Sequence, residues 1–181
     1  MAAQGNSSDA VRQRFEGEAL AHLDTLLRSA IRILGSVHEA EDVVQETYLR
    51  AWRYFDSFEV GTNCRAWLFR IMFNVVNGKK GKQSRMPESS LDDLDSAAMP
   101  GNVVDFDPTR RIEGNEVLDA AGRLPEAYRS VLWLVVVEEF SYRETSDILG
   151  VPIGTVMSRL HRARNELRKI LTVSRGNCAQ A

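Results

Sequence analysis

The stretch SYRETSDILGVPIGTVMSRLHRARNELRKIL, residues 141–171, decides the fold. Ser141 and Glu144 form a capping box, because the hydroxyl can accept from the amide three residues on while the carboxylate reaches back. Gly150 and Pro152 then end a short helix, since glycine supplies a left-handed cap and proline cannot continue the helix. A second helix is predicted over 153–171, where one face is apolar: Val156, Leu160, Ala163, Leu167 and Ile170. Two helices joined by such a turn predict a helix-turn-helix.

The second of these helices is basic along its other face. Its polar side chains are Ser158, Arg159, His161, Arg162, Arg164, Arg168 and Lys169, opposed by Glu166. Small and basic side chains near its start suit the major groove of DNA, where Arg donates to guanine and Ser to a phosphate or a base. The residues alone also allow a plainer interpretation, an amphipathic helix with a basic, solvated face.

Upstream, residues 20–55 predict two helices separated by Gly35. The first has an apolar stripe: Leu20, Leu23, Leu27, Ile31 and Leu34. Ser36 and Glu39 form a second capping box for the next helix. That helix has one apolar face: Ala40, Val43, Val44, Thr47, Ala51, Trp52 and Phe55. Its opposite face is charged around Leu49, which indicates either a contact point or an ordinary exposed leucine.

A third helix is predicted over 63–80, apolar around most of its circumference. Arg70, Asn74 and Asn77 form its one polar stripe, because spacings of four and three share a helix face. Amides and an Arg beside Phe69 and Phe73 suit stacking on bases and hydrogen bonding to their edges. The basic end suits phosphates: Lys79, Lys80, Lys82 and Arg85. A buried helix with one wet stripe remains the equal alternative.

The apolar run 131–137 is strand-like, yet it lies within a longer helical pattern. That pattern contains Leu124, Tyr128, Val131, Leu132 and Val135. The expected fold class is therefore all-α.

Charge is segregated along the 181 residues, although the net charge is only −2. Residues 1–86 carry 12 basic and 10 acidic side chains, residues 87–122 carry 2 and 9, and residues 123–181 carry 9 and 6. The acidic middle contains Pro87, Pro100 and Pro108 and shows no sustained helical period. It is expected to be a flexible linker between two mildly basic modules, which fits either a polyanion-binding design or a plain solvated connection.

Several classes of protein are disfavoured by the composition. The two cysteines, Cys64 and Cys178, are too few for a disulfide framework or a four-ligand zinc site, and a reducing cytosol is the expected compartment. No apolar run is long enough to cross a membrane, and no signal peptide is expected at the N-terminus. His22, His38 and His161 are scattered, and no catalytic motif is present. Neither an enzyme nor a bound metal or cofactor is expected.

Three blocks together resemble a known family. EDVVQETYLRAWRYFDSF (41–58), NCRAWLFRIMFNVVN (63–77) and LPEAYRSVLWLVVVEEFSYRETSDILGVPIGTVMSRLHRARNELRKIL (124–171) are similar to bacterial RNA polymerase sigma factors of the extracytoplasmic-function class. The resemblance implies two small helical domains: a promoter-melting domain of three to four helices over 1–86 and a helix-turn-helix domain over 113–175. An acidic flexible linker over 87–112 would join them, with a tail over 176–181.

The same resemblance implies site residues. The first domain would bind the polymerase through Asp42, Gln45, Glu46, Leu49 and Arg50. It would bind and melt the −10 element through Phe58, Asn63, Arg70, Asn74, Asn77 and Lys80, and Phe58 and Asn74 would hold a flipped base. The helix-turn-helix would read the −35 duplex through Thr155, Met157, Ser158, Arg159, His161 and Arg162. Met157 departs from an Arg found in some members.

The expected partners are core RNA polymerase, promoter DNA and a cognate anti-sigma factor. A stand-alone helix-turn-helix regulator that dimerises on a palindrome is the main alternative. Such a regulator would need neither the helix predicted over 63–80, which would melt the −10 element, nor the acidic linker. Cys64, beside the melting loop, is expected to be an ordinary thiol that is partly buried.

Overall fold

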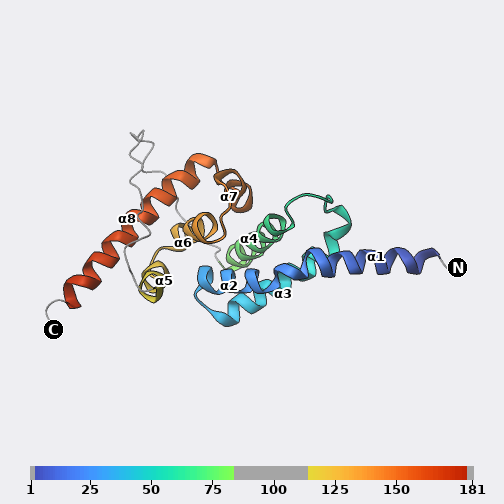
Figure 1. The fold of residues 1–181 in the computed structure, drawn as a ribbon, viewed down its shortest axis with the longest axis horizontal. Helices are drawn as coiled ribbons and strands as arrows, with labels where there is room; N and C mark the ends of the chain where they lie inside the picture. The colour runs from blue at the N-terminus through green and yellow to red at the C-terminus, as the bar shows by residue number, and fades with distance from the viewer. Residues whose placement is uncertain (1–2, 84–113, 179–181) are drawn as a thin grey trace.

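The computed structural model describes residues 3–83 and 114–178 of the chain, and within these two segments every regular element is a helix (Figure 1). The N-terminal elements are α1 (Ala3–Glu18), η1 (Leu20–His22), α2 (Leu23–Leu34), α3 (Val37–Tyr54), η2 (Phe55–Ser57) and α4 (Cys64–Gln83). The C-terminal elements are α5 (Gly114–Gly122), α6 (Glu126–Leu132), η3 (Trp133–Val137), α7 (Tyr142–Leu149) and α8 (Ile153–Cys178). The all-α prediction is confirmed. The linker predicted over 87–112 lies outside the described residues.

The N-terminal domain is built from α1 to α4, with α3 packed between α2 and α4. Ser36 caps α3, accepting a hydrogen bond from the Glu39 amide at 3.3 Å, which is one of the two bonds of the predicted capping box. An aromatic group on α1, α3 and η2 closes one end of the core, with Phe15 edge-on to both Trp52 and Phe55 at 5.0 Å between ring centroids. The α1 helix then extends beyond this core at one end of the molecule (Figure 1).

The buried face of α2 differs from the predicted stripe. Leu20 and Leu23 are about 40% exposed, whereas Leu26, Ala30 and Ile33 are almost fully buried, and Ser29 lies among them. The predicted Leu27, Ile31 and Leu34 pack at the margin of the core. The buried residues of α2 are therefore each about one position earlier in the sequence than the predicted stripe. The reason is that α2 packs against the second domain as well as the first. Gly35 ends α2 with φ of 77°, as its position predicts.

The helix-turn-helix is confirmed in α7 and α8. Both reciprocal bonds of the Ser141–Glu144 capping box are present, and Gly150 ends α7 in the left-handed region with φ of 68°. Val156 and Leu160 of α8 pack on Val131 of α6. The α8 helix begins at the predicted residue and continues to Cys178, past the predicted end at Leu171.

The apolar run after α6 is a π-helical turn rather than a continuation of the α-helix. Glu138 donates its amide to the carbonyl of Trp133 at 3.0 Å, the i to i−5 spacing of a π-helix. Glu139 follows with φ of 55°, a left-handed conformation that side-chain-bearing residues rarely adopt. This turn redirects the chain from α6 into α7.

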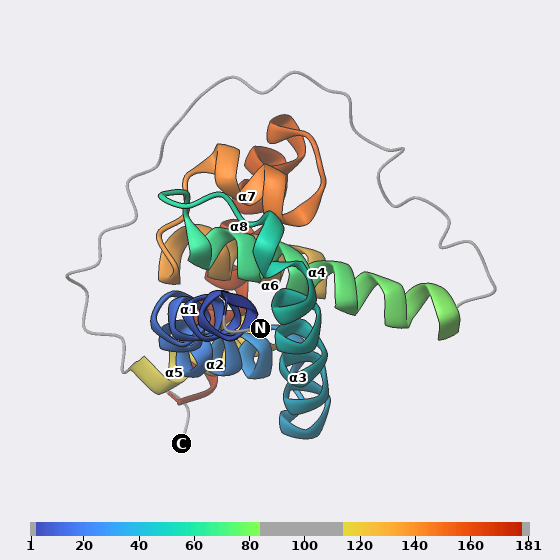
Figure 2. The same cartoon turned by 90° about the vertical axis from the view of Figure 1, so that its right-hand side faces the viewer.

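The two domains lie against each other, and part of the second domain's apolar residues join the core of the first, while Val131, Val156 and Leu160 form a separate cluster. Phe140 and Ile148 of the second domain belong to the same buried group as the core of the first. Phe69 of α4 meets Phe140 edge-on at 5.2 Å between centroids. The view along α1 shows α4 lying between the first-domain helices and α7 (Figure 2). The structure thus places the two domains in direct contact.

Candidate functional site

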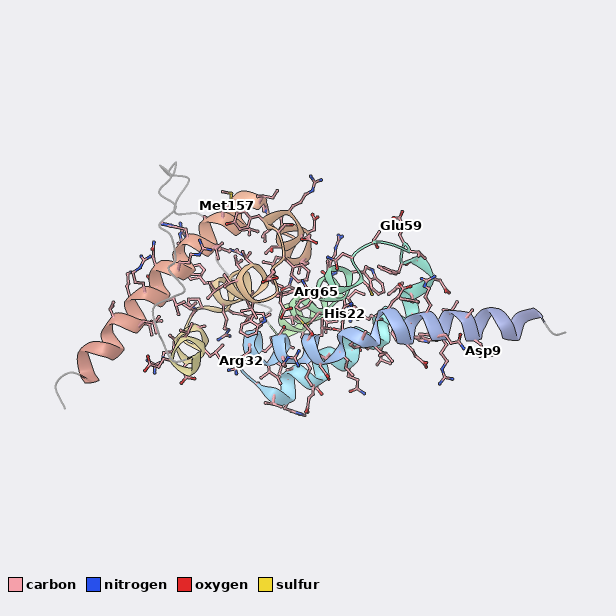
Figure 3. The ribbon with its side chains drawn as sticks, in the orientation of Figure 1. Asp9, His22, Arg32, Glu59, Arg65 and Met157 are labelled. Carbon is pink, nitrogen blue, oxygen red and sulfur yellow. The ribbon has the colours of Figure 1, made fainter. Side chains whose placement is uncertain are left out.

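The α8 helix presents its predicted DNA-reading residues near its N-terminal end. Met157 is 53% exposed and His161 is exposed, while Thr155, Ser158, Arg159 and Arg162 are half-buried. Ser158 Oγ donates to the carbonyl of Thr155 at 3.1 Å. The opposite face of α8 is buried against α6, and this packing keeps these side chains on the outer face. Figure 3 shows Met157 at the outer surface near the start of α8.

A basic groove of about 520 Å³ lies beside this reading face. It is bounded by the α5–α6 connection and by the later turns of α8, and it contains Arg123, Tyr128, Arg162, Asn165 and Arg168. Arg168 donates to Asn165 Oδ1 at 3.2 Å, and Asn165 Nδ2 lies 3.1 Å from His161 Nε2. The position of Asn165, one turn after His161, could have indicated this contact from the sequence.

The polar stripe of α4 is present as predicted. Arg70, Asn74 and Asn77 are exposed along one face. Phe69 and Phe73 are buried at 0% and 4% exposure, so neither ring beside the stripe presents a face to a base. The side chain of Lys80 lies outside those that the structure describes. Hydrogen bonding by the amides and Arg70 is therefore what this face offers a nucleic acid.

The loop before α4 holds Phe58 inside the domain. Phe58 is 5% exposed, stacked on Phe55 with centroids 5.7 Å apart and packed against Trp67 at 4.9 Å. Arg14 of α1 lies over the Phe55 ring at 4.5 Å and donates to the Phe58 carbonyl at 3.5 Å. In this arrangement the Phe58 ring supports the loop from within and is shielded from a flipped base.

Asn63 caps α4 and also contacts the second domain. Its Oδ1 accepts from the Ala66 amide at 3.1 Å, and its Nδ2 donates to Glu144 Oε1 at 2.9 Å. Asn63 is thus held by both domains at once.

The predicted polymerase-binding residues share the outer face of α3. Asp42, Gln45 and Arg50 are exposed, Leu49 is 58% exposed, and Glu46 is half-buried. Arg50 pairs with Glu46 at 2.7 Å, and Lys79 of α4 approaches Asp42 at 4.0 Å. Protein-binding surfaces have an apolar centre and a polar rim, and an exposed Leu49 with polar neighbours can supply both.

Cys64 is half-buried at the start of α4. Burial, reinforced by the nearby Glu18 carboxylate and opposed by Arg14, raises the pKa of its thiol to about 11. A thiol with such a pKa is almost entirely protonated at neutral pH, which makes it a poor nucleophile. The expectation of an ordinary thiol agrees with this environment.

A polar group between the domains has no counterpart in the sequence predictions. Ser29 of α2 donates to Glu138 Oε1 at 2.5 Å, and Trp133 Nε1 donates to the same oxygen at 3.2 Å. Arg65 of α4 lies 3.5 Å from the other carboxylate oxygen and donates to the Glu138 carbonyl at 2.5 Å. The Glu138 side chain is 7% exposed. Nothing in the local pattern distinguishes Ser29 or Glu138, since each is defined by a partner about 70 to 110 residues away.

Within the described segments, no group of three or more His, Cys, Asp and Glu side chains could hold a metal ion. None of the helices described there is both long and apolar enough to cross a membrane.

Comparison with known proteins agrees with this geometry. Residues 19–85 match the family Sigma-70 region 2, and residues 114–167 match Sigma-70, region 4. The ECF RNA polymerase sigma factor SigW of Bacillus subtilis is 34% identical, over 82% of this chain and 83% of the relative. EcfG of Rhodopseudomonas palustris, also an ECF RNA polymerase sigma factor, is 35% identical over 86% of this chain and 84% of the relative.

A solved structure gives the same result. The sigma factor RpoE of Bartonella quintana, crystallised with the anti-sigma factor NepR, matches with a TM-score of 0.67 and 32% identity, over 89% of this chain and 98% of that one. The chain belongs to the ECF sigma factors of bacterial RNA polymerase. It is a transcription initiation factor that binds core polymerase and directs it to promoters, recognising the −35 duplex and melting the −10 element.

Proposed function

We propose that the three exposed faces on α3, α4 and α8 divide this function among them. The observation that carries the proposal is the separation of these faces on different helices, each backed by a buried apolar side. The −10 domain would comprise residues 1–86, the linker 87–112 and the −35 domain 113–175, with a tail over 176–181.

The α4 stripe would read the −10 element. Arg70, Asn74 and Asn77 have donors in reach of a strand laid along the helix, and Asn74 would hydrogen bond the edge of a flipped base. Lys80 would contact phosphate. Asn63 and Phe58 would act from the preceding loop, with Phe58 reaching a base only after the loop rearranges from its buried position.

The start of α8 would read the −35 duplex. His161 and Arg162 would donate to base edges, Met157 would make an apolar contact, and Ser158, Thr155 and Arg159 would contact phosphates or the backbone. The face of α3 around Leu49 would bind the polymerase, through Asp42, Gln45, Glu46 and Arg50 as well.

The chain would have no catalytic activity or cofactor of its own and would act in the cytoplasm, where the polymerase is. We propose further that an anti-sigma factor controls it. The support is the relative crystallised with NepR, together with the fold shared with CnrH, whose structure contains the cytosolic domain of CnrY.

Co-elution of the purified full chain with core RNA polymerase on a sizing column, without DNA, tests the proposal. A stoichiometric complex is expected. When promoter DNA is then added to the recovered complex, opening is expected only when Asn74 is intact. A folded chain that never joins the polymerase, yet binds a palindromic duplex as a dimer, would overturn the proposal in favour of a stand-alone regulator.

A further inference from the structure

Glu138 is the centre of a buried polar group that joins the two domains. Its carboxylate accepts from Ser29 of α2 and from Trp133 of η3, and it faces Arg65 of α4. Trp133 Nε1 also lies 3.0 Å from Ser29 Oγ, so these side chains form a connected network. Figure 3 shows Arg65 near the middle of the molecule, where the domains meet. We call Ser29, Arg65, Trp133 and Glu138 the latch.

The backbone of the second domain is shaped to build this network. The π-helical turn places Trp133 and Glu138 one turn apart, so that both side chains face α2 and α4. The left-handed Glu139 then brings Phe140 under Arg65, whose guanidinium lies 4.4 Å from the ring centroid. Unusual backbone of this kind persists where surrounding contacts hold it in place.

Two further bonds cross the same boundary. Arg129 of α6 donates to the Ile33 carbonyl at 2.8 Å, satisfying an acceptor in the last turn of α2. Asn63 donates to Glu144 at 2.9 Å, which joins the start of α4 to the first helix of the helix-turn-helix. The domains are therefore held by directional contacts as well as by apolar packing.

This closed arrangement conflicts with simultaneous reading of both promoter elements. The −35 and −10 elements are named by their positions along the promoter, so they lie about 25 base pairs apart, which is roughly 85 Å of duplex at 3.4 Å per base pair. In the structure, Asn63 at the start of the −10 helix is hydrogen bonded directly to the −35 domain. The α3 face around Leu49 stays exposed in this arrangement, so the closed form would hinder polymerase binding through the placement of the second domain and not by covering this face.

We propose that the latch holds the free protein closed and that binding to core polymerase at promoters requires the latch to open. The effect on polymerase binding rests on the proposed function, whereas the latch itself can be tested on the chain alone. If only a fraction of the free chain is open, the apparent affinity for polymerase is reduced by that fraction. The latch thereby limits how much polymerase the chain captures.

The latch residues Ser29 and Glu138 are buried in the closed state and would be exposed to water in the open state, so substitutions there should affect the closed state selectively. Weakening the Glu138 network destabilises the closed state, in which the carboxylate is buried, and leaves the hydrated open state unchanged. Glu138→Gln keeps the shape and removes the charge. Glu139→Gln is the matched control, the same change at the next residue, whose side chain is exposed.

Amide hydrogen exchange of the full-length variants gives the first readout. Glu138→Gln, and Ser29→Ala as a second variant, should speed exchange about fivefold or more in residues 63–72 and 133–144. In both variants, exchange in residues 156–167 of α8 should stay as in the wild type. The Glu139→Gln variant should exchange like the wild type throughout. Equal acceleration throughout α5 to α8 would mean that Glu138 only stabilises its own domain. Unchanged exchange at the boundary would also overturn the latch.

Affinity for core polymerase gives the second readout. Both latch variants should bind about fivefold more tightly than the wild type, and Glu139→Gln should not. Affinity that is unchanged despite faster exchange would overturn the role of the latch in polymerase capture. If neither the wild type nor any variant binds polymerase, the proposed function fails, while the exchange comparison still decides whether the latch exists.

Discussion

Asn63 Nδ2 donates to Glu144 Oε1 at 2.9 Å, and through this bond the capping motifs of two helices in different domains are joined. Asn63 caps α4 with its other amide atom, and Glu144 Oε2 accepts from the Ser141 amide at 3.0 Å within the capping box of α7. The hydrogen bonds from Ser141 lower the pKa of the Glu144 carboxyl, with smaller contributions from Asn63 and Arg65. Each residue therefore serves its own helix and the opposite domain.

Asn63→Asp should open this contact while keeping the cap of α4. Asp is as good an N-cap residue as Asn, but it has no donor and sets a second carboxylate against Glu144. Small-angle scattering of the full chain should show a larger radius of gyration, with the helical circular dichroism signal unchanged.

Adding Glu144→Gln should restore the compact form, because a glutamine amide can donate to the new aspartate and glutamine also completes a capping box. Glu144→Gln alone should remain compact. A radius that is insensitive to all three variants would show that this bond contributes nothing to domain contact.

Asn74→Ala should impair promoter opening and leave binding to −35 duplex unchanged. The side chain is exposed on α4, so its loss removes base contacts without disturbing the core. Permanganate reactivity of −10 thymines in the polymerase complex measures opening, and the same preparation bound to −35 duplex serves as the control. Equal loss in both assays would contradict the division of roles between α4 and α8.

Arg162→Ala should weaken −35 recognition by about 1–3 kcal/mol at one base pair, if the guanidinium donates to a guanine edge. Binding is measured on the preferred duplex and on duplexes substituted at each position. A preference lost at one position identifies base reading. A uniform loss over all duplexes, with a shallower salt dependence, would instead identify a phosphate contact.

Leu49→Asp should reduce binding to core polymerase by tenfold or more, because it places a charge in the centre of the α3 face. Leu49 is 58% exposed, so the thermal unfolding midpoint should change little. Val37→Asp is the matched control, at 56% exposure and at the start of the same helix. A midpoint that falls steeply for Leu49→Asp alone would mean that Leu49 stabilises the fold.

The Cys64 thiol should react slowly with a chromogenic disulfide reagent in a Cys178→Ser background. Its pKa is raised from 9.0 to about 11. A raised pKa leaves less thiolate at any lower pH, so at pH 8 the native chain should react about a hundredfold more slowly than the unfolded chain. The rate should then climb roughly tenfold for each pH unit up to the raised pKa. Equal rates in the native and unfolded chains would contradict the burial of this thiol.

Local patterns predicted most of the helices because their causes are local. The Ser36 and Ser141 caps, the Gly35 and Gly150 ends and the periodicity of α8 all act within a few residues, and each is present. The exposed stripe of Arg70, Asn74 and Asn77 was likewise predictable, since their spacing places them on one face of an otherwise apolar helix, and that face is the one expected to meet solvent.

Contacts between distant segments explain what the sequence could not predict. The α2 helix buries Leu26 and Ser29 rather than Leu23 because the second domain covers part of it. The resemblance assigned Phe58 to a flipped base, but in the structure the rings of Phe55 and Trp67 enclose it. The role of Glu138 depends on Ser29 and Arg65, and no periodicity in residues 131–140 indicates either partner.

The π-helical turn at Trp133–Val137, which ends α6, contains one residue more than an α-helical turn would. Removing that residue would turn this segment into a regular α-helical turn, and the chain after it would leave the helix about 100° further around the axis, since each residue of an α-helix turns by that angle. Glu138 and Phe140 would then face away from α4, and the helix-turn-helix would approach the first domain from another side. The orientation of a whole DNA-reading module thus depends on the register of a single position.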